Sequence, residues 1–296
     1  MSRLQRILEE GRFAVTAEIT PPASSDLAEL LAKAAPLKGL ADAVNVTDGA
    51  GARAHLESTV AAGVLLEHGI EPILQLTCRD RNRIALQSQL LGAAALGIDN
   101  LLLLKGDDPT KGDQPEAKAV FDLDSAGLAA TAVEMRDHHR LPHGRPVGGS
   151  ADFFVGIADA PIDPPPGWMP TSLRKKVEAG AQFAQTQFCM DADIVRRYAA
   201  RLADSGLGGL HLLVGVAPLA SAKSARWIKS HLAGSIIPDA IVDRLDRARD
   251  PAAEGRAICI DLVRELREIA GVRGAHIMAP LNEAAIVEVL EALRAA

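Results

Sequence analysis

The sequence predicts an α/β protein folded as a single (β/α)8 TIM barrel. Eight short apolar runs, often rich in β-branched residues, recur along the 296 residues, and segments of helical periodicity separate them. Alternation of this kind requires a parallel sheet. Eight strand–helix units in a chain near the usual barrel size of roughly 250 residues favour a closed barrel. An open doubly wound sheet is the alternative.

The predicted strands are short, and one or two helical segments follow each of them. In chain order the strands cover Phe13–Ala17, Ala43–Thr47, Ile73–Thr77, Asn100–Leu104, Phe153–Ala158, Phe183–Phe188, His211–Val216 and Ala275–Met278. The segments with apolar residues at helical spacing are Leu27–Leu37, Leu56–His68, Asn82–Leu96, Asp124–Arg140, Ser172–Ala179, Asp191–Ser205, Ser221–Leu232, Glu254–Ala270 and Ala284–Leu293.

Proline and glycine mark where some of these elements end. Ile19-Thr20-Pro21-Pro22 closes the first strand, and the apolar fourth strand breaks into Lys105-Gly106, where glycine allows a sharp turn. Two irregular stretches, Asp107–Val120 and the proline-rich Asp159–Pro170, follow the fourth and fifth strands. In a barrel both lie on the active-site face, so we expect them to be functional.

The composition indicates a well-cored globular protein and excludes several classes of function. The chain is 48% hydrophobic and carries a net charge of −6, which argues against a nucleic-acid partner. Cys78, Cys189 and Cys259 are widely spaced without a C-x-x-C pair, so we expect reduced, buried thiols and no metal site. No apolar run has the length of a signal-peptide core or membrane span, so the expected location is cytoplasmic, without a membrane partner. Residues 1–296 are expected to form one catalytic barrel without a regulatory domain, and the oligomeric state stays open.

Glu18 is the most informative single residue. It lies at the end of the first predicted strand, and no basic residue is near it in the sequence. Partial desolvation at the tip of a buried strand favours the protonated form of a carboxyl group, which can then donate a proton near neutral pH. The alternative is a solvated acid at the end of the strand, without a chemical role.

Other polar side chains fall at the ends of different strands, where a barrel brings them to one mouth. They are Thr47 and Asp48, Gln75 and Thr77, Lys105 and Asp107, and Gln187. Asp107 or Asp108 can instead cap a turn. Asp48-Gly49-Ala50-Gly51-Ala52-Arg53-Ala54 loosely matches a dinucleotide fingerprint, but simple turn geometry explains it better.

The remaining basic candidates are weaker. His138, His139 and His143 are expected in a solvated loop, and His276 is expected as a hydrogen-bonded core histidine. Arg174-Lys175-Lys176 is typical of a solvated helix face, although near the barrel mouth it can also contact a phosphate.

Several of these segments together resemble the methylenetetrahydrofolate reductase family. The resemblance runs in order from about residue 13 to about residue 290. It is carried by Glu18-Ile19-Thr20-Pro21-Pro22, Asn45-Val46-Thr47, Gln75-Leu76-Thr77-Cys78, Lys105-Gly106-Asp107, Leu173–Ala181, Thr186-Gln187-Phe188 and Pro280-Leu281-Asn282.

The resemblance implies reduction of 5,10-methylenetetrahydrofolate to 5-methyltetrahydrofolate. Glu18 matches the family's general acid, which protonates the folate amine and opens the five-membered ring to an iminium, the acceptor of the hydride. Asp107 matches the acid that binds the pterin and stabilises the cation, and Gln187 matches a glutamine that hydrogen-bonds the folate. Gln75 and Phe188 complete the expected substrate site.

Departures from the family pattern concern the cofactor. Family members usually pass the hydride of NAD(P)H through bound FAD, and their flavin site uses polar and aromatic side chains. At the corresponding positions this chain has Gln75, Ala158, Ile162, Met169, Ser172 and Ala222. Thr47, Lys105 and Lys176 keep polar or basic character and are the expected cofactor-binding residues. The sequence thus predicts direct transfer from NADH or NADPH, with the FAD route as the alternative.

Two further functions are compatible with the same residues. A barrel that binds a folate or another pterin without redox chemistry needs no acid at Glu18. A deazaflavin-dependent reductase of a related pterin is a second enzymatic alternative. The residues named above do not distinguish NADH from NADPH. No acid that binds the ribose hydroxyl and no arginine that binds the 2′-phosphate can be assigned.

Overall fold

The chain forms a closed barrel of parallel strands that pair in sequential order, β1 with β2 and onward until β8 returns to β1. A computed structural model describes residues 1–280 and 282–295. The barrel prediction is confirmed, and the open sheet is wrong. The strands are β1 (Ala14–Ile19), β2 (Ala43–Val46), β3 (Pro72–Thr77), β4 (Asn100–Leu104), β5 (Phe154–Asp159), β6 (Phe183–Phe188), β7 (His211–Val216) and β8 (Val272–Ile277).

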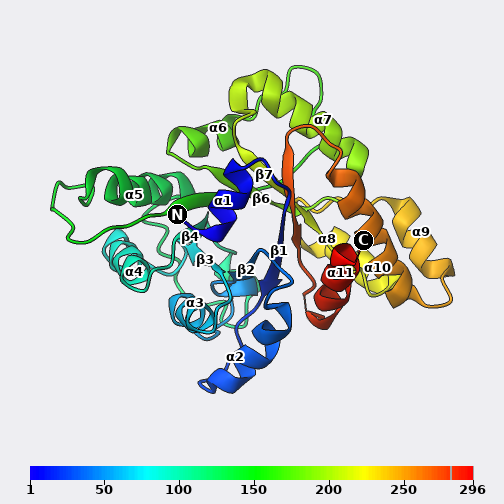
Figure 1. Ribbon diagram of the computed structural model, residues 1–296, viewed down its shortest axis with the longest axis horizontal. Helices are drawn as coiled ribbons and strands as arrows, with labels where there is room; N and C mark the ends of the chain where they lie inside the picture. Colours follow the sequence, from blue (N-terminus) through cyan, green and yellow to red (C-terminus); the bar gives the residue numbers. More distant parts are fainter. Residues whose placement is uncertain (281, 296) are drawn as a thin grey trace.

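Helices surround the strands in chain order, from α2 around to α11 (Figure 1). They are α1 (Arg3–Glu9), α2 (Leu27–Ala34), α3 (Ser58–Glu67), α4 (Arg83–Ala95), α5 (Ser125–His138), α6 (Thr171–Glu178), α7 (Ala192–Leu202), α8 (Ala222–His231), α9 (Asp239–Arg247), α10 (Pro251–Leu266) and α11 (Ala284–Arg294). Helices α1 and α9 are not among the predicted segments. Both are short amphipathic helices outside the regular strand–helix repeat.

Alternate residues of each strand point into the barrel, and this alternation creates layers. On β1, Ala14 belongs to the apolar cluster at the amino end, whereas Thr16 is hydrogen-bonded to the side chain of His276 from β8. Glu18 follows one layer further along. Because the strands are parallel, the inward residues near their carboxyl ends meet at a single mouth.

Helix α1 closes the amino end of the barrel. Its apolar residues Leu4, Ile7 and Leu8 join the inward side chains of the first layer of the strands. Ser2 caps the helix and donates a hydrogen bond to Asn100 at the start of β4, with 2.6 Å between the oxygens. The helix lies near the centre of the view in Figure 1. Solvent access to the interior is thus directed to the carboxyl end.

The loops at the carboxyl end are tied to the neighbouring strand ends. Gly106 after β4 has a φ of +96°, and a Cβ there would come within 2.8 Å of Arg79, so only glycine fits this turn. Further along the same loop, the backbone N–H of Val120 donates to the Arg79 carbonyl, at 2.7 Å. The predicted irregular stretch after β4 is therefore a structured loop.

The three cysteines and the lengths of the helices bear on two of the predictions. Cys78, Cys189 and Cys259 are free and buried, as predicted. Among the described residues, no helix is both long enough and apolar enough to span a bilayer. In the motif Pro280-Leu281-Asn282, Leu281 lies outside the described residues.

Candidate active site

Glu18 lies at the barrel mouth and is held by two neighbours from other strands. Strand β1 runs two residues farther than predicted, to Ile19, so Glu18 is the fifth residue of the strand. Gln75 of β3 donates a hydrogen bond from Nε2 to Glu18 Oε2, at 2.9 Å. His276 Nε2 of β8 lies 3.5 Å from the same oxygen. The side chain is 21% exposed, so it can be reached from the mouth.

A buried polar layer supports this acid from below. Thr16, Asn45, Gln185 and His276 are each at most 3% exposed. Asn45 and Gln185 pair through both of their amide groups, with N···O distances of 2.6 and 3.0 Å. Buried amides are retained at low cost only when they are hydrogen-bonded, and this layer meets that condition.

A buried ion pair ties the loop after β2 to the end of β3. Asp48 accepts two hydrogen bonds from the Arg81 guanidinium, at 2.6 and 3.0 Å, and two more from Thr77. Next to it, Thr47 Oγ1 is buried and has no hydrogen-bond partner within the described residues. An orphaned hydroxyl at the edge of an active-site mouth is available to a ligand.

The predicted acid Asp107 and its neighbour Asp108 have different local roles. Asp107 is exposed on the loop after β4 and accepts a hydrogen bond from the backbone N–H of Gly51, at 2.9 Å. Asp108, not Asp107, caps the short turn that follows, through the Thr110 N–H. The contact to Gly51 places Asp107 beside the loop that follows β2. Lys105 is also exposed, and its Nζ lies 5.4 Å from the centre of the Phe121 ring.

The β5–β6 side of the mouth carries the other predicted residues. Gln187 is half-buried at the end of β6, and its Oε1 accepts a hydrogen bond from the Phe188 backbone N–H. Phe188 itself is 1% exposed and packs in the core between strands and helices. Its role in substrate binding stays a prediction.

Lys176 is half-buried beside the end of β5. Its ammonium donates to the Ala158 carbonyl, at 2.6 Å, and burial lowers its pKa, an effect that nearby Asp159 partly opposes. Asp159 accepts a hydrogen bond from Tyr198 at 2.5 Å, and burial raises the pKa of this carboxyl group. The sequence analysis did not identify the Asp159–Tyr198 pair, because nothing in the spacing links β5 to α7.

The residues at the family's flavin positions offer little to a flavin ring. From the end of β5 to the first turn of α6 these positions hold Ala158, Ile162, Met169 and Ser172, of which Met169 and Ser172 are exposed. Ala222 is 4% exposed and packs within the core at the start of α8. An isoalloxazine ring is usually held by stacking and by hydrogen bonds. Of the positions compared, only Gln75 and Ser172 carry a hydrogen-bonding group, Gln75 already donates to Glu18, and none is aromatic.

The weaker candidates are resolved by local geometry. Ala50–Ala52 forms a short 3-10 turn with Gly49 and Gly51 at positive φ, and α3 begins only at Ser58. No helix N-terminus follows these glycines directly, so the turn interpretation holds. His276, predicted as a core histidine, is indeed buried and hydrogen-bonded, but its contact with Glu18 was not predicted. Only the pairing of β8 with β1 reveals it.

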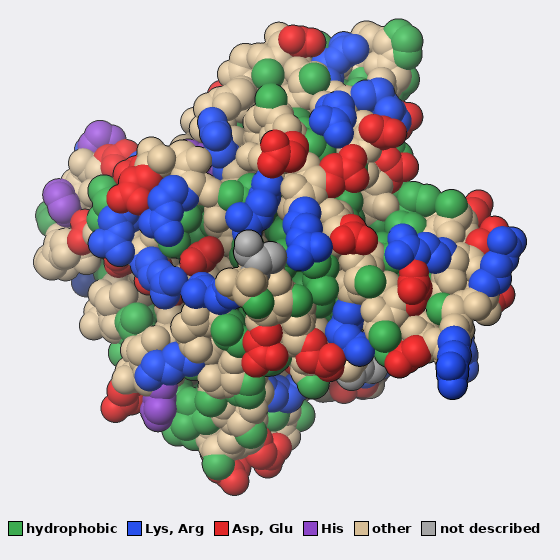
Figure 2. Space-filling view, turned by 45° about the vertical axis from the view of Figure 1, so that its right-hand side comes forward, with side chains coloured by type: hydrophobic (Ala, Val, Ile, Leu, Met, Phe, Trp, Pro, Cys, Tyr) green, Lys and Arg blue, Asp and Glu red, His purple; other side chains and the backbone are tan. Residues whose placement is uncertain are grey.

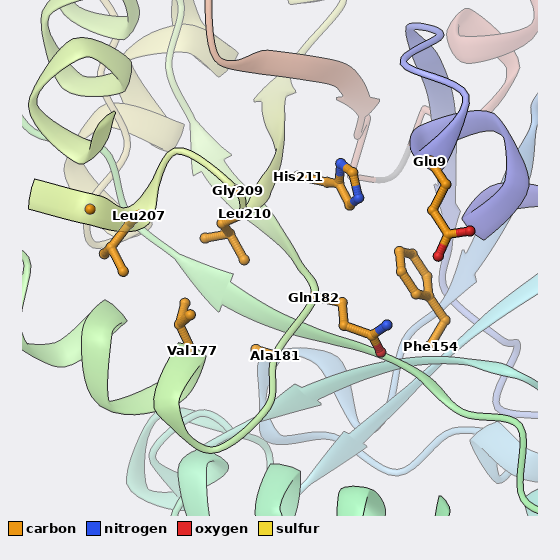
Figure 3. A pocket seen from close by; sticks show the side chains of 10 residues that line it. Glu9, Phe154, Val177, Ala181, Gln182, Leu207, Gly209, Leu210 and His211 are labelled. Atoms are coloured by element: carbon orange, nitrogen blue, oxygen red, sulfur yellow. The ribbon is translucent and has the colours of Figure 1, made fainter. Parts of the chain in front are cut away.

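A second pocket lies away from this mouth, at the amino end of the barrel. It has a volume of about 290 Å³. Figure 3 shows Glu9, Phe154, Gln182 and His211 turned toward its common space. None of the predicted site residues lines it. On the face shown in Figure 2, acidic and basic side chains are interspersed.

An acid, amides and a histidine at the carboxyl ends of the strands place this chain in the class of TIM-barrel enzymes. A family model described as methylenetetrahydrofolate reductase matches residues 3–294. The chain belongs to the methylenetetrahydrofolate reductase family.

Individual relatives agree with this assignment. The 5,10-methylenetetrahydrofolate reductase of Pectobacterium carotovorum is 27% identical over 281 residues, which cover 90% of this chain and 85% of that protein. The Escherichia coli protein of the same name is 26% identical over 279 residues, covering 90% and 86%. A Caenorhabditis elegans protein, named probable methylenetetrahydrofolate reductase (NADPH), is 26% identical over 244 residues, covering 80% of this chain. That match spans about a third of the nematode protein, 34% of its length.

One solved structure shares the whole fold. It is an uncharacterized protein from Clostridium thermocellum, described as binding two copies of 5-methyl-5,6,7,8-tetrahydrofolic acid. Its TM-score is 0.69 at 14% sequence identity, and the match covers 99% of each chain. At this identity the likeness shows the common barrel.

Proposed function

We propose that this protein reduces 5,10-methylenetetrahydrofolate to 5-methyltetrahydrofolate with NADH or NADPH. The observation that carries the proposal is Glu18 at the carboxyl mouth of the barrel, with Oε2 held by Gln75. Within the described residues, Oε1 accepts no hydrogen bond from the protein, so this oxygen is free to carry a proton to a substrate. Membership of the family supports the choice of folate.

In the proposed reaction, one acid donates a proton and a second acid stabilises a cation. Protonated Glu18 donates to the folate amine, the bond from that nitrogen to the methylene carbon breaks, and the ring opens to an iminium. A hydride from the nicotinamide then reduces the iminium carbon to a methyl group and leaves NAD(P)⁺. Asp107, as a carboxylate on the loop after β4, stabilises the cation before it is reduced. Gln187 at the end of β6 orients the folate.

We propose that the hydride passes directly from the nicotinamide to the folate. Thr47 and Lys176 suit a nucleotide, because one offers an orphaned buried hydroxyl and the other a half-buried ammonium. Lys105 adds an exposed positive charge on the loop after β4. FAD, when bound, would relay the hydride, but the side chains at the family's flavin positions fit its ring poorly. Relatives are named for NADPH and for NADH, so both donors are tested.

The direct route is tested by the absorption spectrum of the protein as purified. Rapid mixing with NADH or NADPH and 5,10-methylenetetrahydrofolate follows, with no flavin added. We expect no flavin absorption and a folate-dependent loss of NAD(P)H. Stoichiometric flavin on which turnover depends would contradict the direct route. Oxidation only of a reduced deazaflavin would instead identify the related pterin reductase.

Replacing Glu18 separates a reductase from a barrel that only binds folate. We expect Glu18→Gln to lower kcat by about a hundredfold to ten-thousandfold, the usual range for loss of a general acid, while folate binding stays measurable. Glu67→Gln is the matched control, because Glu67 is an exposed acid on α3. Folate binding without any NAD(P)H oxidation by the wild type would favour the carrier.

A further inference from the structure

We propose that His276 is a positioning residue for the general acid. With Gln75 it holds Oε2 of Glu18, so that the transferable proton resides on Oε1. This inference rests on the proposed function, in which Glu18 is the proton donor. The two contacts come from different sides of the acid, since His276 is on β8, which pairs with β1, and Gln75 is on β3, two strands away in the other direction. Together they fix the rotation of the carboxyl group about its last bond.

The hydrogen-bond network determines which ring nitrogen of His276 carries the proton. Nδ1 lies 3.0 Å from Thr16 Oγ1. That hydroxyl oxygen already accepts a hydrogen from Gln185 Nε2, at 3.1 Å, so its own hydrogen is free for donation. The Ala275 carbonyl, another acceptor for it, lies farther away at 3.5 Å. Thr16 therefore donates to Nδ1.

The orientation of Gln185 is fixed in turn by Asn45. Asn45 Nδ2 donates to Gln185 Oε1 at 2.6 Å, and Gln185 Nε2 donates back to Asn45 Oδ1 at 3.0 Å. The Gln185 amide thus presents its nitrogen, a pure donor, toward Thr16 and His276. A neutral imidazole that accepts at Nδ1 carries its hydrogen on Nε2, the nitrogen that faces Glu18.

Oε2 accepts the Gln75 hydrogen bond and faces His276 Nε2 at 3.5 Å, and this unequal surrounding of the two carboxyl oxygens decides where a proton binds. The carbonyl oxygen of a carboxylic acid is the better acceptor, so Oε2 remains the carbonyl oxygen and Oε1 takes the proton. Oε1 has no protein partner within the described residues, and the side chain is partly exposed. The acid is thereby oriented for donation into the mouth and not into the protein.

A histidine with a purely structural role would look different. His211, on the neighbouring strand β7, points into the pocket at the amino end, 6.3 Å from the ring centre of Phe154. Both ring nitrogens of His276 instead contact polar side chains within the barrel. His211 is therefore the matched control for substitutions of His276.

The ring state can be tested without any assay of activity. We expect the ¹⁵N spectrum of histidine-labelled protein to show His276 with hydrogen on Nε2, its signals being assigned by their loss in His276→Gln. Glu18→Gln should shift the Nε2 signal, because it replaces the carboxylate acceptor. Hydrogen on Nδ1, or a signal that does not respond to Glu18→Gln, would overturn the proposal.

The kinetic test compares two substitutions at the same position. His276→Leu fills the space without a donor, and we expect kcat to fall by about tenfold or more while KM for folate changes less than about threefold. His276→Gln places an amide N–H near the former Nε2 and should recover most of kcat. The same two substitutions at His211 should leave kcat unchanged. Equal losses in both His276 variants would overturn the positioning role.

Thr16→Val is a smaller change that tests the same network if His276→Leu does not fold. Thr16→Val keeps the shape of the side chain but removes the hydrogen donated to Nδ1, so kcat should fall by about threefold to tenfold. An unchanged kcat in Thr16→Val, with Nε2 still protonated, would overturn the account of the network. A wild type that oxidises no NAD(P)H would refute the proposed function, while the ¹⁵N spectra would still decide the geometry.

Discussion

The two ends of the barrel interior are made by the same strands from different side chains. At the amino end, strand residues and α1 form an apolar cluster of Leu4, Ile7, Leu8, Ala14, Ala43, Ile73, Leu102, Phe154, Phe183 and Leu213. One layer toward the carboxyl end, the inward residues are polar and linked by hydrogen bonds. On β1, successive layers are two residues apart, and the inward residues change from Ala14 to Thr16 and then to Glu18.

Because of this difference, we expect the amino end of the barrel to contribute mainly to stability and the carboxyl end mainly to the reaction. Burial of apolar side chains stabilises the amino end. Buried polar groups at the carboxyl end contribute little net stability even when partnered. Two polar atoms at this end, Thr47 Oγ1 and Glu18 Oε1, have no protein partner within the described residues. Substitutions at the amino end should therefore alter folding, and those at the carboxyl end should alter turnover.

The largest expected effect on stability is at Phe183, in the centre of the apolar end. Its ring stacks on Phe154 with 4.9 Å between ring centres, and it is fully buried. We expect Phe183→Ala to lower the free energy of unfolding by about 3–5 kcal/mol, measured by urea denaturation. Trp227→Ala on exposed α8 is the control and should cost below about 1 kcal/mol. A large fall in kcat of the folded Phe183 variant would contradict the separation.

A smaller effect is expected from overfilling the same layer. A Cβ at Gly156 of β5 would come within 2.1 Å of the Phe183 ring. Gly156→Ala should therefore cost about 1–3 kcal/mol through forced displacement of that ring. Adding Phe183→Leu should make the two changes less than additive in a double-mutant cycle, because the smaller side chain relieves the clash. Strict additivity would show that Gly156 acts through the backbone alone.

Much of this arrangement follows from the sequence because it is local. Apolar runs, their alternation with helical segments and polar residues at strand ends predicted the barrel and the position of Glu18 at its mouth. Residues that are two apart in a strand point to the same face of the sheet. This alternation depends only on local backbone geometry, so it can be predicted from the sequence. The ends of elements shifted by a few residues, as for β8, which begins at Val272 and not at Ala275.

The features that were missed depend on contacts between distant segments. His276 meets Glu18 only because β8 closes the barrel against β1. The pairing register between β6 and β7 shifts between Gln185 and Phe188, and alternation along the sequence alone does not reveal such a shift. Helix α1 is stabilised by packing its apolar residues across the amino end of the barrel, a contact that lies outside the repeat of strands and helices in the sequence.

Asp159 differs from the other polar residues at the carboxyl end, because the burial of this acid should affect the stability of the protein. Burial raises its folded pKa above the unfolded value, although the Tyr198 hydrogen bond and Lys176 oppose the shift. Between these two values the folded protein binds more protons than the unfolded chain, so the contribution of Asp159 to stability falls as pH rises. One group can contribute at most about 1.4 kcal/mol per pH unit.

Asp159→Asn should remove this pH dependence while keeping an acceptor for Tyr198. The measurement is the difference in unfolding free energy between wild type and variant, from about pH 4 to about pH 8. We expect the wild type to lose stability relative to Asp159→Asn as pH rises through this range. Asp204→Asn, on an exposed turn after α7, should give a flat difference. A wild type that gains stability relative to Asp159→Asn would mean that the Tyr198 and Lys176 contacts outweigh burial, so that this acid stabilises the mouth in its charged form.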